Sequence, residues 1–486
     1  MKHPALEDCH WQKRTDDNGT VIYTRPMVAG EHTLDQVHQL IHGHDQFAFG
    51  ATFRSNLSLE TIHERLLGAL VRLRYYSPLV AARPQAGIHD DELRSWVYAP
   101  LPDHNAAVAW ARKTVVIKAP TKQLPDVETH ICDILSRPLP ANEIFEVHLI
   151  GPYQDGQFTL MTYKSHALAE GQAAIDLLAT LFDWILNPTI GEDLAWGQEW
   201  RNLLPGTVVT LGRENEEWDL DSSETSIEIM RKHGVDKPAH ALRPQRESIT
   251  DLGKIIRIHR QLDEATTSLL VQAARSEGIS ITHLFEAAHA ITTYTIAPLS
   301  PDELADSHIR YYPSIVSTRH HRKAPYDKRE LVGNVNTAFT QIIPAKVHCD
   351  KATVRDRVLA VAKEIKNNYR AFMSNPHHPL MEATLVKLHP FRGPLGVDIN
   401  ANTGEIIGLG VIDNKLPLIW RSSDDQDTIR INDVHLGLRQ CNKRPMVHLW
   451  TLEGKLRLQL QASDVWDESY LGRFLDEMIK SALSIC

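Results

Sequence analysis

The spacing of hydrophobic residues along this chain predicts strands and helices in alternation. On both sides of Asp155-Gly156 every second residue is apolar or β-branched, which predicts a hairpin with its turn at that dipeptide. Apolar residues at helical spacing follow the hairpin from Ile175 to Ile185, and an earlier stripe runs from Leu59 to Leu73 behind a capping Ser58. The first part of the chain is therefore predicted to combine a sheet with packed helices.

A second block of the same character begins at residue 254. Its predicted strands cover 254–262, 311–318 and 332–343, and a late hairpin turns at Glu453-Gly454. Asp263 stands where it would cap a helix, and Asp467 stands in the same position before the last apolar stripe. The pattern thus predicts an α/β protein with two similar halves.

A polar segment separates the two blocks. It contains Pro205-Gly206 and an acidic run over residues 214–221, which is typical of a solvated linker and suggests no chemistry. We therefore expect a first half over residues 1–190, a crossover over 191–253 and a second half over 254–486.

Composition narrows the function classes. The 486 residues include 42% hydrophobic ones, enough for a sizeable core, and the net charge of −9 disfavours general nucleic-acid binding. The five cysteines are scattered without a CxxC pair, and the histidine pairs His42/His44 and His377-His378 lack metal-ligand spacing, so neither a disulfide framework nor a metal site is predicted. No signal peptide or membrane-spanning run is visible, so we expect a cytoplasmic monomer with no membrane partner.

The segment 165–171, Ser-His-Ala-Leu-Ala-Glu-Gly, carries the candidate chemistry because it joins the hairpin to the following helix. His166 would be held rigidly just past a buried strand, where it could face a cavity. A neutral imidazole there can take a proton from an alcohol or amine that attacks an acyl carbonyl, without a metal or a covalent intermediate. The alternative for the segment alone is a hydrogen-bonded core histidine beside a surface glutamate.

Glu170 needs a cationic partner if its carboxylate points inward, because an unpaired buried charge is costly. Arg319 follows an apolar strand of the second half and is the candidate, which predicts a Glu170–Arg319 ion pair between the halves. The alternative for Arg319 is a surface charge within the basic run 319–323.

Taken together, these motifs resemble those of the superfamily that contains CoA-dependent acyltransferases and the condensation domains of nonribosomal peptide synthetases. Segment 165–171 is similar to their HxxxDG motif, and Arg319 followed by Val332-Gly333-Asn334-Val335-Asn336-Thr337 is similar to their arginine and VNT segments. Residues 408–413 are similar to a later region of fungal members. Within the superfamily the chain most resembles fungal trichothecene 15-O-acetyltransferase-like and alcohol acetyltransferase-like proteins, from about Gly30 to the last helix.

The resemblance implies two chloramphenicol-acetyltransferase-like lobes in a V, with a central tunnel that donor and acceptor enter from opposite faces. It implies that His166 is the general base and that Glu170, Gly171 and Arg319 support the site. We expect further substrate contacts from six residues: Tyr163, Ser165, Asn334, Asn336, Ser422 and Ser423. The implied activity moves an acyl group, expected to be acetyl, from CoA as co-substrate to a hydroxyl of a small secondary metabolite, with no permanently bound cofactor.

Two departures from the family pattern keep other functions open. Ser165 replaces the first histidine of condensation domains, and Glu170 replaces the aspartate of the motif. One alternative is a freestanding condensation-like enzyme that forms an ester or amide from an acyl donor on a separate carrier protein. The other is a diverged scaffold that catalyses a cyclisation or rearrangement without acyl transfer.

Overall fold

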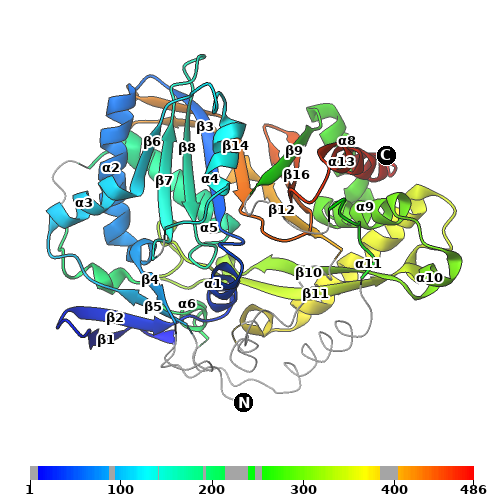
Figure 1. Cartoon of the computed structure of the whole chain (residues 1–486), viewed down its shortest axis with the longest axis horizontal. Helices are drawn as coiled ribbons and strands as arrows, with labels where there is room; N and C mark the ends of the chain where they lie inside the picture. Colours follow the sequence, from blue (N-terminus) through cyan, green and yellow to red (C-terminus); the bar gives the residue numbers. More distant parts are fainter. Residues whose placement is uncertain are drawn as a thin grey trace.

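The computed structural model describes residues 9–86, 94–140, 142–189, 193–213, 239–246, 254–381, 383 and 403–486. Within them the chain forms two lobes side by side, each built on its own multi-stranded sheet (Figure 1). The predicted α/β architecture with a sheet in each half is confirmed. The predicted acidic run at 214–221 lies outside the described residues.

The sheet of the first lobe has six strands in the order β13-β14-β3-β8-β7-β6. All neighbours run antiparallel except the parallel pair β6 and β7. Two of its strands come from far along the chain, so the predicted second half also contributes to the first sheet. The strands are β3 (Phe47–Ser55), β6 (Val115–Lys118), β7 (Phe145–Ile150), β8 (Phe158–Lys164), β13 (Ile419–Arg421) and β14 (Thr428–Leu438).

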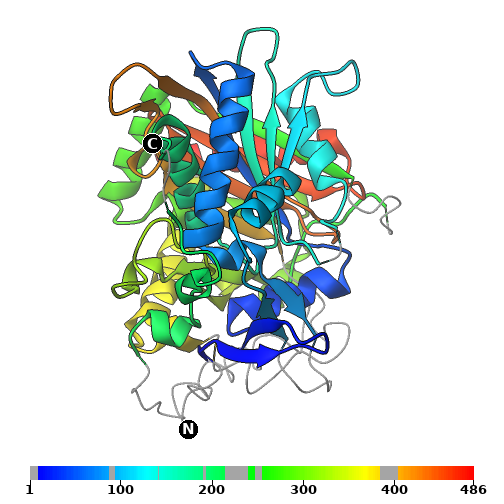
Figure 2. The same cartoon turned by 90° about the vertical axis from the view of Figure 1, so that its left-hand side faces the viewer.

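Helices cover both faces of this sheet. The larger core lies under α2 (Leu59–Tyr76), α3 (His104–Thr114) and α5 (Gly171–Leu186), and Figure 2 shows α2, in blue, in front of the sheet. On the other face α4 (Val127–Leu135) packs over Ala48, Met161 and Tyr163. A smaller sheet has the strand order β1-β2-β5-β4. Its strands are β1 (Gln12–Thr15), β2 (Val21–Pro26), β4 (Arg83–Gln85) and β5 (Ser95–Tyr98). The remaining helical segments of the first part of the chain are α1 (Gly30–Leu40), η2 (Pro78–Ala81), η3 (Glu199–Asn202) and α6 (Thr207–Thr210).

The second lobe is built on a four-stranded sheet in the order β12-β15-β16-β9 and a two-stranded ribbon of β10 and β11. The helices of this lobe pack against one face of its four-stranded sheet, and a second hydrophobic core is buried between them. The strands are β9 (Ile255–Gln261), β10 (His308–Ser317), β11 (Asn336–Pro344), β12 (Glu405–Val411), β15 (Met446–Leu452) and β16 (Lys455–Ser463). The helices are α8 (Glu264–Ser276), α9 (Ile281–Ile296), α10 (Pro301–Asp306), α11 (Val354–Ser374) and α13 (Glu468–Leu483), with short turns η4 (Arg319–His321), η5 (Ala345–Val347), η6 (His378–Leu380) and η8 (Ile412–Asn414).

The local signals in the sequence place most of these elements correctly. Ser58, Asp263 and Asp467 each accept a hydrogen bond from the third residue of the helix that they cap. The segment predicted as a strand from residue 332 pairs only from Asn336 onward, because residues 332–335 pass under the first lobe instead, where the Val332 amide bonds to Ser77. Among the described helices none is long and apolar enough to cross a membrane.

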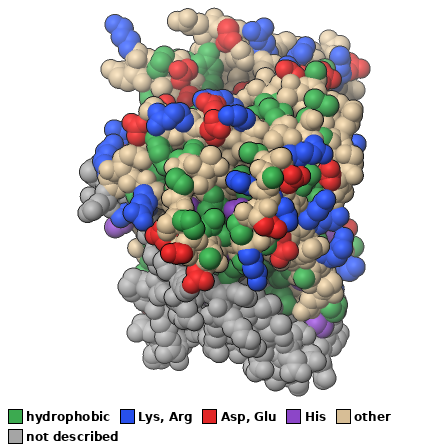
Figure 3. Space-filling view, turned by 90° about the vertical axis from the view of Figure 1, so that its right-hand side faces the viewer, with side chains coloured by type: hydrophobic (Ala, Val, Ile, Leu, Met, Phe, Trp, Pro, Cys, Tyr) green, Lys and Arg blue, Asp and Glu red, His purple; other side chains and the backbone are tan. Residues whose placement is uncertain are grey.

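The two lobes meet along a polar face of the second sheet. Leu449, Leu458 and their neighbours on its other face belong to the core of the second lobe. On the polar face, Arg257 donates to the carbonyl of Leu436 in β14 at 2.8 Å, and the Gln461 side chain accepts from the Leu438 amide at 3.1 Å. These bonds attach the second sheet to the edge of the first. The outer surface of the second lobe mixes acidic and basic side chains (Figure 3).

A buried acid in the second lobe generates a prediction about stability. Glu286 of α9 is 2% exposed and accepts from the Tyr369 hydroxyl at 3.0 Å. Burial raises its pKa from 4.5 to about 8, although Tyr369 and Gln341 oppose this by hydrogen bonding. The folded protein therefore holds this proton more tightly than the unfolded chain does. The associated stability is present below pH 4.5 and is lost as the pH rises towards 8.

We expect Glu286→Gln, which cannot ionise, to reduce the loss of melting temperature between pH 6 and pH 9. The exposed Glu264→Gln on α8 is the control and should leave that pH dependence as in wild type. Thermal unfolding at several pH values measures both. An unchanged slope in Glu286→Gln would show that the buried acid is not the titrating group.

Candidate active site

His166 lies in the short connection between β8 and α5, as the sequence predicts. Its ring packs against Phe47, the first residue of β3, with ring centroids 4.7 Å apart. Its backbone carbonyl accepts a hydrogen bond from Nδ2 of Asn334 at 2.9 Å, and Asn334 belongs to the second lobe. The histidine is therefore held from both lobes.

A cavity of about 410 Å³ lies between the lobes, and His166 is on its wall. Helix α5 contributes Gly171 and Gln172, whereas Tyr369 and Met373 come from α11 of the second lobe. The prediction that this histidine faces a cavity between the halves is confirmed. A continuous tunnel through the molecule stays a prediction.

The surroundings of His166 keep its ring neutral. Burial lowers the pKa of the imidazole, and the charge of Lys164 lowers it further, while Asp45 and the carbonyl oxygen of His166 itself act in the opposite direction. Nδ1 of His166 is buried and has no hydrogen-bond partner among the described residues. A neutral imidazole on a cavity wall can accept a proton from a bound hydroxyl group.

Glu170 caps helix α5. Its carboxylate accepts hydrogen bonds from the backbone amides of Gln172 and Ala173, the latter at 3.0 Å. Burial raises its pKa, and the charge of Arg319 only partly offsets this. The glutamate thus fixes the start of the helix that follows the histidine, and it does not need a direct cationic partner because amide groups satisfy its oxygens.

The predicted ion pair between Glu170 and Arg319 is wrong. Nε of Arg319 donates to Asp176 at 2.8 Å, and both side chains are largely buried, with 11% and 16% exposed. Asp176 lies within α5, and it is further along the chain from His166 than Glu170 is. Arg319 still links the two lobes as predicted, but it does so through the helix rather than through the motif acid.

Gly171 allows the second lobe to approach the histidine loop. A Cβ atom at this position would lie 3.1 Å from Cδ2 of Leu409 in β12, closer than most carbon contacts. Both residues line the cavity. The glycine of the motif therefore supports the site by letting β12 pack tightly against the first turn of α5.

The two asparagines of the second lobe have different roles. Both polar atoms of the Asn334 side chain are hydrogen-bonded. Its Nδ2 donates to the His166 carbonyl, and its Oδ1 accepts from the backbone amide of Asn336 at 3.2 Å. It positions the histidine and is not free for substrate. Asn336 lines the cavity, and its Oδ1 has no hydrogen-bond partner among the described residues. Of the two asparagines, Asn336 is therefore the one that lies where a bound molecule could contact it.

Four other predicted substrate contacts do not line this cavity. Tyr163 points to the opposite face of the sheet, where its hydroxyl lies 2.7 Å from the carbonyl of Arg137. Side chains alternate along a strand, so Tyr163 cannot share the face of Lys164. The buried Ser165 hydroxyl accepts from the Ala167 amide. Ser422 and Ser423 lie between β13 and β14, at the end of β14 that pairs with Ser55 and not with Phe47.

Sequence reasoning missed two residues next to His166. Phe47 lines the cavity, and Nζ of the fully buried Lys164 lies 4.0 Å from the centre of the Phe47 ring. A lysine at the end of an otherwise apolar strand, two residues before the histidine, was the visible signal. Nothing in the sequence indicated that Phe47 would face both side chains, because it lies more than a hundred positions away.

A second hollow of about 400 Å³ adjoins the cavity and shares His283, Tyr369 and Met373 with it. Lys366 and Arg370 also line it, one turn apart on α11. Nζ of Lys366 donates to the Gly278 carbonyl, and the Arg370 side chain is exposed. The mouth on this side of the cavity is therefore basic.

A larger hollow of about 630 Å³ lies elsewhere on the junction between the lobes. It is lined from the first sheet by residues such as Thr52 and His435 and from the second by Trp450 and Arg457. His166 is not part of its wall. Of the three hollows, only the 410 Å³ cavity combines both lobes with the candidate base.

The whole fold is similar to solved enzymes that transfer acyl groups and to condensation domains. The structure of the TRI3 trichothecene 15-O-acetyltransferase from Fusarium sporotrichioides matches with a TM-score of 0.80 and 16% identity, over 100% of this chain and 99% of that one. The condensation domain of the Monacolin K polyketide synthase MokA matches with a TM-score of 0.62 and 9% identity, over 95% and 97%. The starter condensation domain of rhizomide synthetase, in complex with C8-CoA, matches with a TM-score of 0.61 and 12% identity, over 95% and 94%.

These similarities define the class as the acyltransferase and condensation-domain fold. A family model described as 15-O-acetyltransferase Tri3 matches residues 39–392, which include both His166 and the Asn334–Asn336 segment. The chain belongs to the Tri3 15-O-acetyltransferase family and is an O-acetyltransferase. No curated protein matches the sequence.

The capping role of Glu170 predicts how substitutions act on stability. We expect Glu170→Ala to lower the free energy of unfolding by about 1 kcal/mol, within the range of 0.5–2 kcal/mol for a lost cap. Glu170→Gln should cost less, because its side-chain oxygen can still accept from an amide of the first turn. Chemical denaturation measures both. Equal losses in the two variants would mean that the charge, and not the cap, is what matters.

Proposed function

We propose that this enzyme moves an acetyl group from acetyl-CoA to a hydroxyl group of a small, largely apolar secondary metabolite, with His166 as the general base. The observation that carries the proposal is the position of His166 on the wall of the cavity between the lobes, where burial lowers the pKa of its imidazole. Membership of the Tri3 family supports the acetyl donor and the hydroxyl acceptor.

The chemistry needs no group beyond these side chains and the two substrates. His166 takes the proton of the acceptor hydroxyl as its oxygen attacks the thioester carbonyl carbon. The tetrahedral intermediate carries a negative oxygen, and Asn336 on the cavity wall is the side chain that we assign to donate to it through Nδ2. Collapse of the intermediate breaks the C–S bond, forms the ester and passes the proton from the imidazolium to the departing thiolate of CoA.

The acceptor is expected to be largely apolar because aliphatic side chains from both lobes form a large part of the cavity wall. The volume of about 410 Å³ lies in the usual range for small-molecule sites, roughly 300–1,000 Å³. A molecule with a compact hydrocarbon skeleton and few hydroxyl groups fits such a wall. The aliphatic lining residues are Ile175, Ile315, Val316, Ile406, Ile407, Leu409, Leu436 and Leu438.

We place the donor at the basic mouth formed by Lys366 and Arg370. CoA carries phosphate groups, which ammonium and guanidinium groups bind well, and its pantetheine arm would reach His166 past Tyr369 and Met373. The similarity to condensation domains extends to the fold alone. A phosphopantetheine arm on a carrier protein is the alternative donor, and the experiments below distinguish it from CoA.

His166→Asn is the direct test of base catalysis. Asparagine cannot accept the proton, so we expect kcat to fall by roughly 10²–10⁴-fold while the melting temperature stays close to wild type. Release of free thiol from acetyl-CoA in the presence of candidate alcohols measures turnover. Retention of more than about a tenth of wild-type kcat would contradict the mechanism. Absence of thiol release in the wild type, with transfer from an acyl carrier protein, would favour the alternative donor.

The basic mouth predicts a selective effect on the donor. We expect Lys366→Glu combined with Arg370→Glu to raise the KM for acetyl-CoA about tenfold or more, equivalent to roughly 1.4 kcal/mol of binding, with little change in the KM of the acceptor. Lys363→Glu is the matched control, because Lys363 lies on the same helix but pairs with Glu277 and lines neither hollow. A tenfold effect in the control as well would point to general electrostatics and not to a donor site.

A further inference from the structure

Among the described residues three histidines line the cavity between the lobes, and His448 differs from the other two in its burial. His166 and His283 are partly exposed, whereas His448 is 1% exposed. It is the third residue of β15. The residues on either side of it in the strand, Val447 and Leu449, belong to the core of the second lobe. Because side chains alternate along a strand, His448 points the other way, towards the first lobe.

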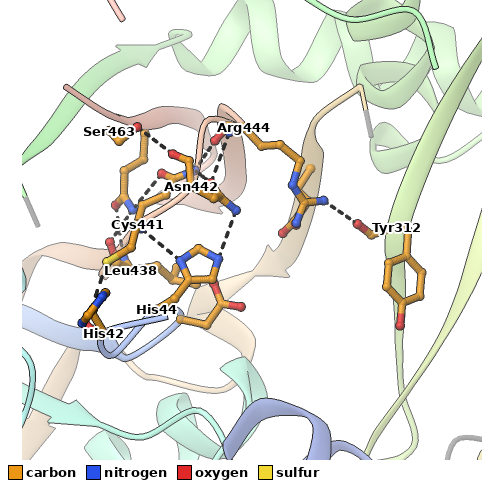
Figure 4. A network of polar contacts seen from close by, with 12 residues as sticks. His42, His44, Tyr312, Leu438, Cys441, Asn442, Arg444 and Ser463 are labelled. Atoms are coloured by element: carbon orange, nitrogen blue, oxygen red, sulfur yellow. Dashed lines mark hydrogen bonds and ion pairs between the residues drawn. The ribbon is translucent and has the colours of Figure 1, made fainter. Parts of the chain in front are cut away.

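The hydrogen bonding of His448 is incomplete. The network in Figure 4 shows a buried histidine that is satisfied by the fold: Nδ1 of His44 accepts from the Cys441 amide at 3.0 Å, and its Nε2 lies 3.0 Å from the Asn442 side chain. Nδ1 of His448, by contrast, is buried and has no hydrogen-bond partner among the described residues. A buried polar atom without a partner costs free energy of folding, so the histidine at this position is a candidate for a binding role.

The polar neighbours of His448 on the same face of the sheet are bonded to one another. Gln459 is its partner in the register of β15 and β16, and Oε1 of Gln459 accepts from Arg257 at 2.7 Å. Arg257 also donates to the Leu436 carbonyl at 2.8 Å. Neither residue is a partner for Nδ1 of His448. The contact between the lobes therefore does not use this nitrogen.

The cavity wall around His448 is aliphatic. Ile407, the partner of His448 in β12, lines the cavity. Leu436 and Leu438 also line it, and they come from β14 of the first lobe. Small-molecule sites typically combine such apolar walls with a few polar groups that fix the orientation of the ligand. His448 adds a polar contact to this aliphatic stretch.

The order of the strands places His448 away from the basic mouth. The mouth lies on α11, which packs on β11, where Phe372 stacks on Phe339 with ring centroids 4.4 Å apart. Beside the ribbon of β11 and β10 lies β12, through the pairing of Tyr311 with Gly404, and β15 follows β12 in the sheet. Strand β12 therefore lies between the ribbon and the strand of His448. Because we place the donor at the mouth, the end of the cavity at His448 is left to the acceptor.

The ring of His448 can bind an oxygen atom in either of two ways. Burial is the main reason that its pKa is lowered to about 3, and charges on Arg257 and His166 act in the same direction, so the ring is neutral. No described residue fixes the position of the ring proton, because Nδ1 has no partner. The neutral imidazole can donate to a carbonyl or hydroxyl oxygen, and it can also accept from a hydroxyl group.

We propose that His448 binds a second oxygen function of the acceptor, a hydroxyl or carbonyl group other than the hydroxyl that is acetylated. The acceptor is then an apolar skeleton with at least two oxygen functions, one at His166 and one at His448. His448 determines specificity by holding the acceptor in the orientation in which one hydroxyl reaches the base. This inference rests on the proposed function, in which His166 is that base.

The test measures the binding of matched probes in the absence of acetyl-CoA. Decahydronaphthalenol carries one hydroxyl on two fused hydrocarbon rings, and its isomeric diols and hydroxyketones add a second oxygen. Calorimetric titration should show at least one two-oxygen probe binding to the wild type about tenfold more tightly than the mono-ol, the effect of one well-placed hydrogen bond. In His448→Leu this ratio should fall to about one. Ile407→Leu, which changes the same wall without removing a polar group, is the control and should keep the ratio.

The stability of the variant separates a binding role from a structural one. Leucine leaves no donor or acceptor unpaired at this position, so we expect His448→Leu to fold with a melting temperature equal to or above that of the wild type. His448→Gln keeps a hydrogen-bonding group and should retain part of the preference for the second oxygen. A lower melting temperature in His448→Leu together with an unchanged ratio would show that the histidine serves the fold, and would overturn the proposal.

The binding measurement is independent of the proposed function. If no two-oxygen probe binds more tightly than the mono-ol, or if the preference survives in His448→Leu, the role of His448 is overturned, even where His166→Asn is inactive. If His166→Asn stays active, the proposed function fails, while the probe ratio still decides whether His448 recognises a second oxygen. A fall in kcat that His448→Leu shows equally for mono-ol and diol, with no change in the ratio, would assign His448 to the tetrahedral intermediate and would likewise overturn the proposal.

Discussion

The candidate site depends on one hydrogen bond between the lobes, from the Asn334 side chain to the His166 carbonyl at 2.9 Å. The histidine comes from a short connection in the first lobe, which by itself could tilt in several ways. The second lobe holds its backbone from one side, and Phe47 holds its ring from another. Because the cavity is bounded by both lobes, the same contact that holds His166 also joins the two lobes that form the cavity wall.

The glutamate of the motif makes sense as a helix cap. Its longer side chain reaches two amides of the first turn of α5, so its carboxylate is satisfied locally and the arginine of the second lobe is free to bind elsewhere. Arg319 binds Asp176 instead. In this chain the ion pair between the lobes therefore runs through Asp176 of α5 and not through the glutamate of the motif. Gly171 preserves the close approach of β12 to that same turn.

Burial dominates the electrostatics of this protein. It lowers the pKa of His166 and of Lys164 and raises that of Glu170 and of Glu286. In each case the neutral form is favoured, because water is replaced by protein that solvates charge poorly. For His166 this produces the form that can accept a proton, and for Glu286 it produces a stability that declines as the pH rises. The same physical effect thus favours the neutral form of both His166 and Glu286.

The sequence by itself determined the features that depend on neighbouring residues: the hairpin that ends at Lys164, the helices behind Ser58, Asp263 and Asp467, and a histidine at the turn between strand and helix. These features follow from period and capping, which are local. Only the tertiary structure decided that Asp176 binds Arg319, that Asn334 holds the histidine rather than substrate, and that β14 joins the first sheet. Such contacts join segments more than a hundred residues apart. The partners in such contacts depend on how whole helices and strands pack. The local sequence pattern does not show whether Arg319 binds Glu170 or Asp176 further along the same helix.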